Sequence, residues 1–118
     1  APVIVFDKNK DLMLITGSPG GSLIPAAILR VVTGIIDFDL NVGEATMLTR
    51  VHKDWPTTGI LHEKTLSSDL AKGLNIIGHK VTEEHTMGST QSIHIVDGIN
   101  YGYADLRRPN ASVSIQPN

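Results

Sequence analysis

The stretch LITGSPGGSLIPAAILRVV, from Leu14 to Val32, decides how the first part of the chain folds. It passes from a short apolar segment, through a loop with two adjacent glycines, Gly20 and Gly21, into a long apolar run. This change of pattern predicts a buried strand, a tight turn and a helix from Leu23 to about Asp37. The sequence thus places two side-chain-free residues between a strand and a helix.

The predicted helix begins with residues that suit a helix start and then has few polar side chains. Ser22 is the expected N-cap, and Pro25 is tolerated in the first turn, where an amide hydrogen would lack a partner. Because the helix is apolar nearly all round, we expect it to be buried on most sides, with a layer above and a layer below. The complete core is therefore expected to include residues outside these 118.

The surrounding segments predict a mixed α/β layering with antiparallel strand pairs. Val3–Phe6 and Leu12–Thr16 barely alternate in polarity, which predicts a hairpin that is buried on both faces. Asn41, with Glu44 three residues later, predicts a short helix that opens with a capping box. The remaining pattern predicts an irregular segment at residues 50–59, strands at 60–63 and 80–83, and a weak amphipathic helix at 67–78. It ends in a hairpin at 89–106 and a poorly ordered tail at 109–118.

Composition limits the classes of protein to which the chain can belong. A length of 118 residues with 41% hydrophobic residues fits one small domain or a piece of a larger one. The formal net charge of -2 argues against nucleic acid or an anionic membrane surface as a partner. The chain has no cysteine, which excludes disulfides, thiol catalysis and thiolate metal sites. The longest apolar run, Leu23–Ile36, contains Arg30 and is too short to span a bilayer.

The first residues, APVIVFDKNK, enter almost directly into a strand pattern. They lack a basic region ahead of an apolar one, so we expect no signal peptide in them. A start of this kind is expected of a cut or processed product.

The glycine pair, Gly20 and Gly21, has two interpretations. In one, the glycines only permit a turn with positive φ. In the other, their bare N–H groups lie at the positive end of the helix macrodipole and face a phosphate, a carboxylate or the oxyanion of an acyl-transfer intermediate. The chain has neither G-x-x-x-x-G-K-[ST] nor G-x-G-x-x-G, so it gives no support for a nucleotide cofactor.

Other chemistry-bearing residues give weaker signals. Hydroxyl side chains are frequent but no G-x-S-x-G elbow occurs, and MGSTQS at 87–92 is interpreted as a strand entry with local side-chain to backbone hydrogen bonds. Arg50 and the Asp105–Arg108 segment are candidates for ion pairs, which contribute little at a surface and more if Arg50 is buried against a carboxylate. No metal is predicted, because no close ligand spacing occurs among His52, His62, His79, His85 and His94.

Several segments in a fixed order then point to one family. LITGSPGGS is followed by IDF, NVGEA, R-x-H-x-x-W, EK-x-LS, GHKV, MGSTQSI and YGYADLRRP. In order and spacing, from about Pro2 to about Pro109, these segments closely resemble the C-terminal part of the γ-glutamyltransferases (γ-glutamyltranspeptidases). Two departures are local: Leu48-Thr49-Arg50 stands where the family usually has Ala-Pro-Arg, and the end NASVSIQPN differs from the usual Gly-Tyr finish.

The resemblance implies a fold and a mechanism. The family has the N-terminal-nucleophile-hydrolase fold, a four-layer α-β-β-α sandwich, of which residues 1–118 would supply a C-terminal portion. Its precursors cut themselves into a large and a small subunit, and the new N-terminal threonine attacks a γ-glutamyl amide such as glutathione, forming an acyl-enzyme that water or an amino acid resolves. By resemblance, Gly20 and Gly21 take the oxyanion-hole role. Ser18 and Ser22 flank the pair and are expected to support the loop, not to be catalytic.

The resemblance also implies partners and an incomplete site. The threonine, the paired serines that hold the substrate carboxylate and the large-subunit arginine would all lie outside this chain. We therefore expect the segment alone to be inactive and able to self-associate, with the rest of the small subunit and the large subunit as partners and a periplasmic or extracellular location. The alternatives are a related acylase or capsule depolymerase segment, and a non-catalytic anion-binding or interaction module.

Overall fold

The computed structural model describes residues 1–56, 59–114 and 116, and these fall into two compact units. The first unit combines Ala1–Leu48 with Gly88–Asn118, and the second is Thr49–Met87. Residues 115, 117 and 118 of the predicted tail, and residues 57 and 58 of the predicted irregular segment, lie outside the described residues.

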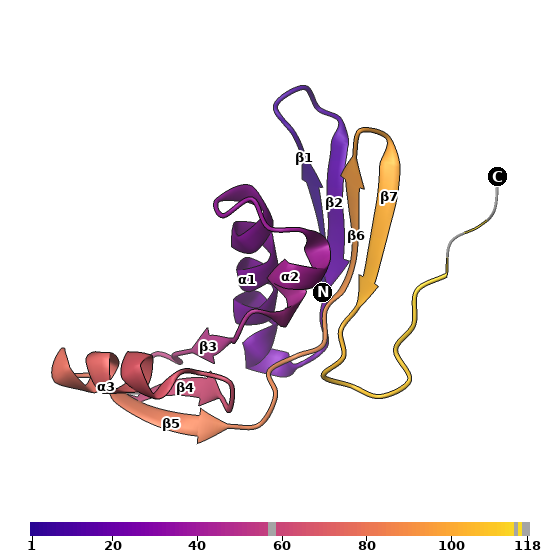
Figure 1. Ribbon diagram of the computed structural model, residues 1–118. Helices are drawn as coiled ribbons and strands as arrows, with labels where there is room; N and C mark the ends of the chain where they lie inside the picture. The colour runs from indigo at the N-terminus through magenta and orange to yellow at the C-terminus, as the bar shows by residue number, and fades with distance from the viewer. Residues whose placement is uncertain (57–58, 115, 117–118) are drawn as a thin grey trace. The chain divides into compact units, whose positions relative to one another are not determined.

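The first unit is built on a four-stranded antiparallel sheet with the strand order β1-β2-β6-β7 (Figure 1). The two hairpins that the sequence predicted form this sheet, and β2 pairs with β6 at its centre. Between the hairpins in sequence, the chain makes a 3-10 turn η1 and two helices, α1 and α2. The bounds are β1 Pro2–Phe6, β2 Leu12–Gly17, η1 Gly21–Leu23, α1 Ile24–Ile36, α2 Val42–Met47, β6 Gln91–Val96 and β7 Ile99–Ala104.

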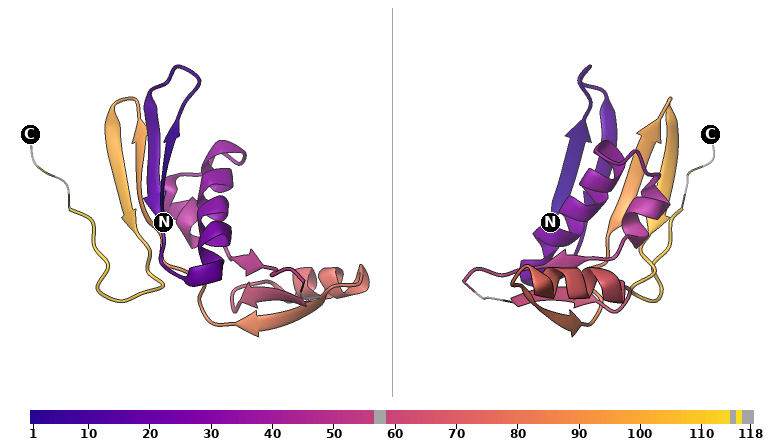
Figure 2. Two further views of the ribbon diagram at one scale, coloured as in Figure 1. Left: turned by 180° about the vertical axis from the view of Figure 1, so that it is seen from behind. Right: turned by 60° about the vertical axis from the view of Figure 1, so that its left-hand side comes forward.

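Both helices of this unit lie on one face of the sheet (Figure 2). The core forms between them, where Leu14 of β2 meets Val31 and Ile35 of α1 and Val42 and Ala45 of α2. The capping box at α2 is confirmed: the Glu44 amide donates to Asn41 Oδ1 at 2.8 Å, and the Asn41 amide donates to Glu44 Oε2 at 3.1 Å. Helix α1, at Ile24–Ile36, also begins and ends within one residue of the bounds that the sequence predicted.

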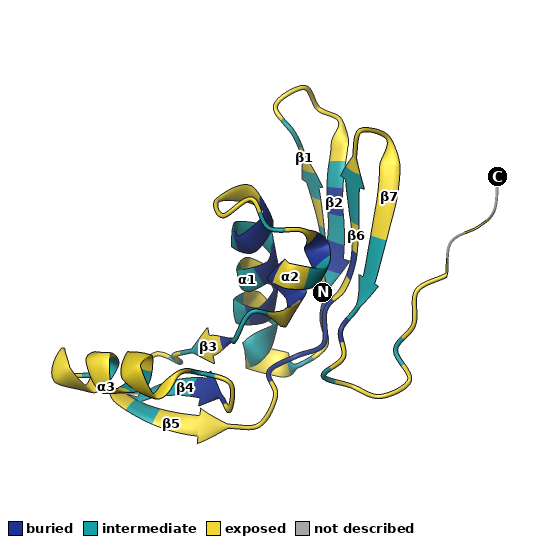
Figure 3. Cartoon of the chain, viewed as in Figure 1, coloured by how far each residue is buried: buried dark blue, intermediate teal, exposed yellow. Residues whose placement is uncertain are grey.

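The prediction that the first hairpin is buried on both faces is wrong for this chain (Figure 3). The register places Ile4 beside Ile15 and Ile15 beside Ile93, in one row across three strands. Ile4 is 57% exposed and Ile93 41% exposed, because the helices cover only the opposite face. Helix α1 likewise leaves Leu29 and Ile36 exposed, so it is not buried on most sides. An apolar run shows that its side chains favour burial, but it does not supply the layer that buries them. The described residues provide a covering layer on only one face of this sheet.

The second unit contains a three-stranded sheet in the order β3-β4-β5 with one helix, α3. Strands β4 and β5 are parallel and are connected through α3, whose N-cap Ser67 accepts a hydrogen bond from the Leu70 amide. The strand and helix predictions at residues 60–63, 67–78 and 80–83 are confirmed, but the parallel pairing and the two-residue β3 within the segment predicted irregular were not foreseen. The bounds are β3 Val51–His52, β4 Gly59–Glu63, α3 Ser68–Ile76 and β5 Lys80–Glu84.

Candidate functional site

The glycine loop, residues 18–21, connects the end of β2 to η1 and α1. Gly20 has φ 135° and Gly21 has φ 60°, two conformations that side chains disfavour and glycine adopts readily. The Leu23 amide donates to the Gly20 carbonyl at 3.1 Å and closes the turn. The turn therefore requires glycine for its backbone, as the first interpretation of the pair predicted.

The same loop is open on the side of Gly21. A Cβ built on Gly21 would meet no heavy atom within 4 Å, and Gly21 is exposed. Neither the Gly20 nor the Gly21 N–H donates a hydrogen bond to any residue in the described part of the chain. Both amides lie ahead of α1, where the unpaired N–H groups of a helix carry partial positive charge. An anion could therefore approach this loop without displacing a side chain.

The prediction of Ser22 as N-cap is wrong. The N-cap of α1 is Leu23, which makes no side-chain capping bond, and Pro25 stands in the first turn as expected. The 3-10 turn η1 precedes the α-helix and includes Ser22, so the serine is already part of a helical turn where its side chain cannot cap. Its side chain is exposed at the surface of the loop.

A second segment, Gly88–Thr90, lies against the glycine loop and is hydrogen-bonded to it. The Ser89 amide donates to Ser18 Oγ at 3.0 Å, and the Ser18 hydroxyl donates to the Pro19 carbonyl at 2.7 Å. MGSTQS does lead into a strand, since β6 begins at Gln91. The expected local bonding of its hydroxyls is wrong for Thr90 and Ser92, whose hydroxyls lie within hydrogen-bond distance of Asp105 and Thr16. No sequence signal links these two segments, because side-chain hydrogen bonds of that range have no periodicity.

Asp105 and Arg107 form a buried network rather than the surface ion pair that the sequence suggested. Their side chains are 0% and 7% exposed, and Arg107 Nη1 lies 3.2 Å from Asp105 Oδ1. Asp105 Oδ2 accepts the Thr90 amide at 2.9 Å, so the carboxylate also holds the Gly88–Thr90 segment. Arg107 donates to the carbonyls of Thr46 and Leu48, at the C-terminal end of α2. This network joins the end of β7 to both α2 and the segment behind the glycine loop.

In the second unit, Arg50 is fully buried, the case in which the sequence predicted a larger effect. The Glu63 carboxylate accepts the Arg50 amide at 2.9 Å and the Met87 amide at 2.9 Å. Arg50 Nη1 donates to the Met87 carbonyl at 2.6 Å. Buried charges with this many partners hold backbone segments in place, and here they hold the end of the unit at Met87.

Two of the five histidines, His52 and His62, lie beside hydrogen-bonding groups. His62 Nδ1 lies 2.9 Å from the Glu63 carbonyl oxygen, and His52 Nε2 lies 2.7 Å from Asp54 Oδ1. Within residues 1–56, 59–114 and 116, no group of three or more His, Asp or Glu side chains is arranged to hold a metal ion. Among the same residues, no helix has both the length and the apolar character that crossing a bilayer requires.

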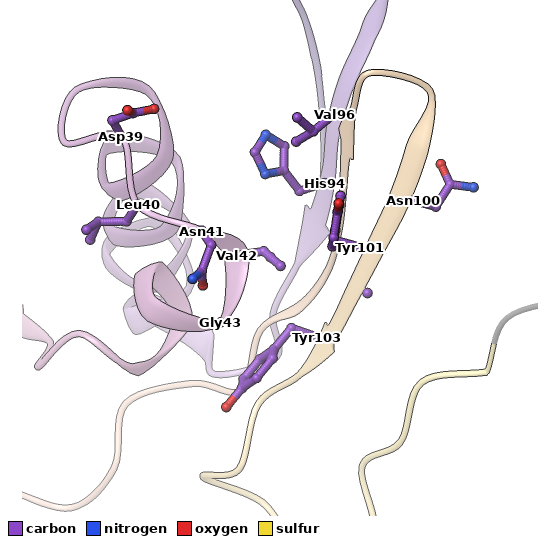
Figure 4. A pocket seen from close by; sticks show the side chains of 11 residues that line it. Asp39, Leu40, Asn41, Val42, Gly43, His94, Val96, Asn100, Tyr101 and Tyr103 are labelled. Carbon is purple, nitrogen blue, oxygen red and sulfur yellow. The ribbon is translucent and has the colours of Figure 1, made fainter.

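A cavity of about 760 Å³ opens between the start of α2 and strands β6 and β7 (Figure 4). His94, Tyr101 and Tyr103 line it from the strands, and Asn41 lines it from the helix side. Burial lowers the pKa of His94 below the ordinary value for histidine. The lining residues do not include the glycine loop, so this cavity and the loop are separate features.

Comparison with known proteins identifies the family. The family described as gamma-glutamyltranspeptidase matches residues 1–115. The chain belongs to the γ-glutamyltranspeptidase family. The chain is 44% identical over 108 residues to the glutathione hydrolase proenzyme of Escherichia coli, covering 91% of the chain and 18% of the relative. The glutathione hydrolase proenzyme of Bacillus subtilis is 29% identical over 117 residues, 97% of the chain and 20% of the relative.

Solved structures confirm the fold class predicted from the sequence. The T380A mutant of Helicobacter pylori γ-glutamyltranspeptidase superposes with a TM-score of 0.86 at 32% identity, covering 92% of this chain and 60% of that one. A cephalosporin acylase from Bacillus halodurans gives a TM-score of 0.86 at 25% identity, over 94% of this chain and 21% of that one. The chain spans about a fifth of the length of these curated relatives.

Proposed function

We propose that this chain is part of an enzyme that transfers or hydrolyses γ-glutamyl groups, and that it supplies the donors that stabilise the oxyanion. Family membership and similarity to glutathione hydrolase proenzymes support the substrate class, which is γ-glutamyl amides such as glutathione. The observation that carries the proposal is the pair of amides at Gly20 and Gly21. Both amides have no hydrogen-bond acceptor among the described residues. A side chain at Gly21 would meet no neighbour within 4 Å, so the loop is open on that side.

In the proposed reaction, a threonine hydroxyl from outside these 118 residues attacks the γ-glutamyl carbonyl carbon. The carbonyl π electrons move to oxygen, and the Gly20 and Gly21 N–H groups donate to the oxyanion that forms. Collapse of this intermediate expels the amine, which takes up a proton, and leaves an ester between the threonine and the γ-glutamyl group. Water or the amino group of an acceptor then attacks the ester through a second oxyanion at the same donors.

The experiment uses a chromogenic γ-glutamyl anilide and three samples: the chain alone, the remaining polypeptide of the enzyme alone, and the two together. We expect turnover only from the mixture, because the proposed nucleophile and the proposed oxyanion donors lie on different segments. Turnover by the chain alone would contradict the placement of the nucleophile. A mixture that forms a complex yet leaves the anilide intact would contradict the proposed function.

The fold similarity to the cephalosporin acylase favours one second candidate, a related acylase with a different acyl donor. The donors would act in the same way, since an oxyanion of any acyl group has the same charge. A parallel assay of the mixture with a glutaryl anilide separates the two functions. Preference for the glutaryl substrate, which lacks the α-amino group, would support the acylase.

A further inference from the structure

The peptide between Pro19 and Gly20 is held on its carbonyl side. The Ser18 hydroxyl donates to the Pro19 carbonyl oxygen at 2.7 Å, and its oxygen accepts the Ser89 amide at 3.0 Å. Ser18 is 5% exposed, so water is largely excluded as a competing partner. One buried hydroxyl thus connects the Pro19 carbonyl to the Ser89 amide, which lies 71 positions from Ser18 along the chain.

The packing around this hydroxyl leaves little freedom. Gly88 has φ 69°, and a Cβ on it would lie 2.6 Å from Ser18 Oγ and 3.0 Å from the Ala27 Cβ. A Cβ on Gly20 would lie 3.4 Å from Gly88 Cα. Gly88 therefore packs closely behind both Ser18 and Gly20 and forms the back wall of the loop. A side chain at Gly88 would collide with Ser18. The glycine loop is open in front, at Gly21, and closed behind.

We propose that Ser18 is a positioning residue that aims the Gly20 N–H out of the loop, an inference that rests on the function proposed above. In a trans peptide the C=O and N–H of one plane point in opposite directions. The Pro19–Gly20 peptide is trans, so anchoring its carbonyl towards Ser18 turns the Gly20 N–H away from the back wall. Without the anchor this plane can rotate, because Gly20 has no Cβ to restrict its φ.

The proposal predicts an effect on the transition state rather than on substrate binding. The oxyanion exists only after attack, so a misaimed donor lowers kcat and leaves KM nearly unchanged. Complete loss of one donor of this kind costs about 100- to 1,000-fold in kcat. A donor that is still present but no longer held should cost less, about 10- to 100-fold. Ser18 itself does not touch the substrate in this account.

The test is Ser18→Ala in the mixture of chain and remaining polypeptide that turns over the γ-glutamyl anilide, with the active sites titrated. Ser22→Ala is the matched control, since it makes the same chemical change on the exposed side of the loop. We expect kcat to fall about 10- to 100-fold for Ser18→Ala with KM within about twofold, and both constants to stay within about twofold for Ser22→Ala. Hydrogen exchange at the Ser89 amide should also accelerate by about tenfold in Ser18→Ala only, because its acceptor is gone.

The outcomes separate the two proposals. If the wild-type mixture does not turn over, the proposed function fails, and Ser89 exchange still tests the anchor. If the wild type is active and Ser18→Ala keeps its kcat within about twofold, or loses activity only through KM, the positioning role is wrong. Should Ser18→Ala fail to fold, Ser18→Cys keeps the site filled with a weaker donor and acceptor, and its kcat should lie below that of the wild type. An unchanged kcat in the cysteine variant would overturn the role.

Discussion

Two turns of the first unit each contain a glycine with a similar positive φ, and the two glycines have different surroundings. Gly21 in the glycine loop has φ 60°, and Gly98 in the turn between β6 and β7 has φ 75°. A Cβ on either residue would meet nothing within 4 Å. The turn at Gly98 only reverses a hairpin, whereas the glycine loop precedes a helix and is held by Ser18 and Ser89 from behind. Long-range hydrogen-bond partners, and not the local turn chemistry, therefore distinguish a candidate site from a simple turn.

The largest effect is expected at Asp105, which holds the segment behind the glycine loop. Asp105→Asn should lower the free energy of unfolding by about 3–5 kcal/mol, because it leaves Arg107 without its buried carboxylate and replaces one acceptor with a donor. The matched control is Asp97→Asn in the hairpin turn, where φ is 50° and asparagine is tolerated, with an expected change within about 0.5 kcal/mol. Urea denaturation of the two variants measures both changes in unfolding free energy. Equal changes would contradict the prediction that the glycine loop depends on a buried support and the hairpin turn does not.

The next effect is on catalysis. Gly21→Ala should lower kcat with the γ-glutamyl anilide about 100-fold, because the new methyl group occupies the space in front of the amides. Gly98→Ala should leave kcat unchanged, since it adds the same methyl group to the turn of the hairpin. Steady-state kinetics of both variants in the reconstituted mixture provide the measurement. A similar kcat for the two variants would remove the functional difference between the turns.

The same pair should cost almost equal amounts of stability. Alanine at a left-handed position costs about 1–2 kcal/mol, and neither methyl group meets a neighbour in the structure. The unfolding free energies of Gly21→Ala and Gly98→Ala should therefore agree within about 0.5 kcal/mol. A much larger loss for Gly21→Ala would show that its kinetic defect reflects unfolding instead of a blocked site.

The smallest expected effect is the pH dependence of stability that comes from His94, in strand β6 of the second hairpin. Burial lowers the pKa of His94, so the folded state keeps this residue neutral at a pH where the unfolded chain already binds a proton. Stability should therefore decline as the pH falls through about 6.5, and the decline should level off below the pKa of the folded state. His94→Gln should flatten this slope in denaturation measured from pH 7.5 to 5, and an unchanged slope would assign it to other groups.

Much of the secondary structure could be read from local signals. Asn41 and Glu44 predicted their capping box because both partners lie within one helical turn, and the second hairpin was evident from the alternation on either side of its turn. The Ser22 N-cap was wrong because an intervening 3-10 turn depends on the path of the chain out of β2. Burial of the first hairpin on both faces was wrong because one covering layer is absent from the described residues.

The sequence predicted the glycine pair of the candidate site but not the residues that support it. Gly20 and Gly21 stood out because adjacent glycines before a helix either permit a turn with positive φ or leave bare amides at the helix start, and the order of motifs pointed to the family. The supports of the loop were not visible in the sequence. Ser89 and Asp105 are a serine and an aspartate like many others until the fold brings one to Ser18 and the other to Thr90.

The sequence by itself determined the α-helices, every strand except β3, the glycine pair and the family, because each depends on residues that are close together or on motifs in a fixed order. Only the tertiary structure decided which polar groups are buried together, which face of the sheet is covered and which way the Pro19–Gly20 peptide is anchored. The physical reason is distance along the chain. A buried hydrogen bond between residues 71 positions apart has no local signature, and only the folded chain brings its donor and acceptor together.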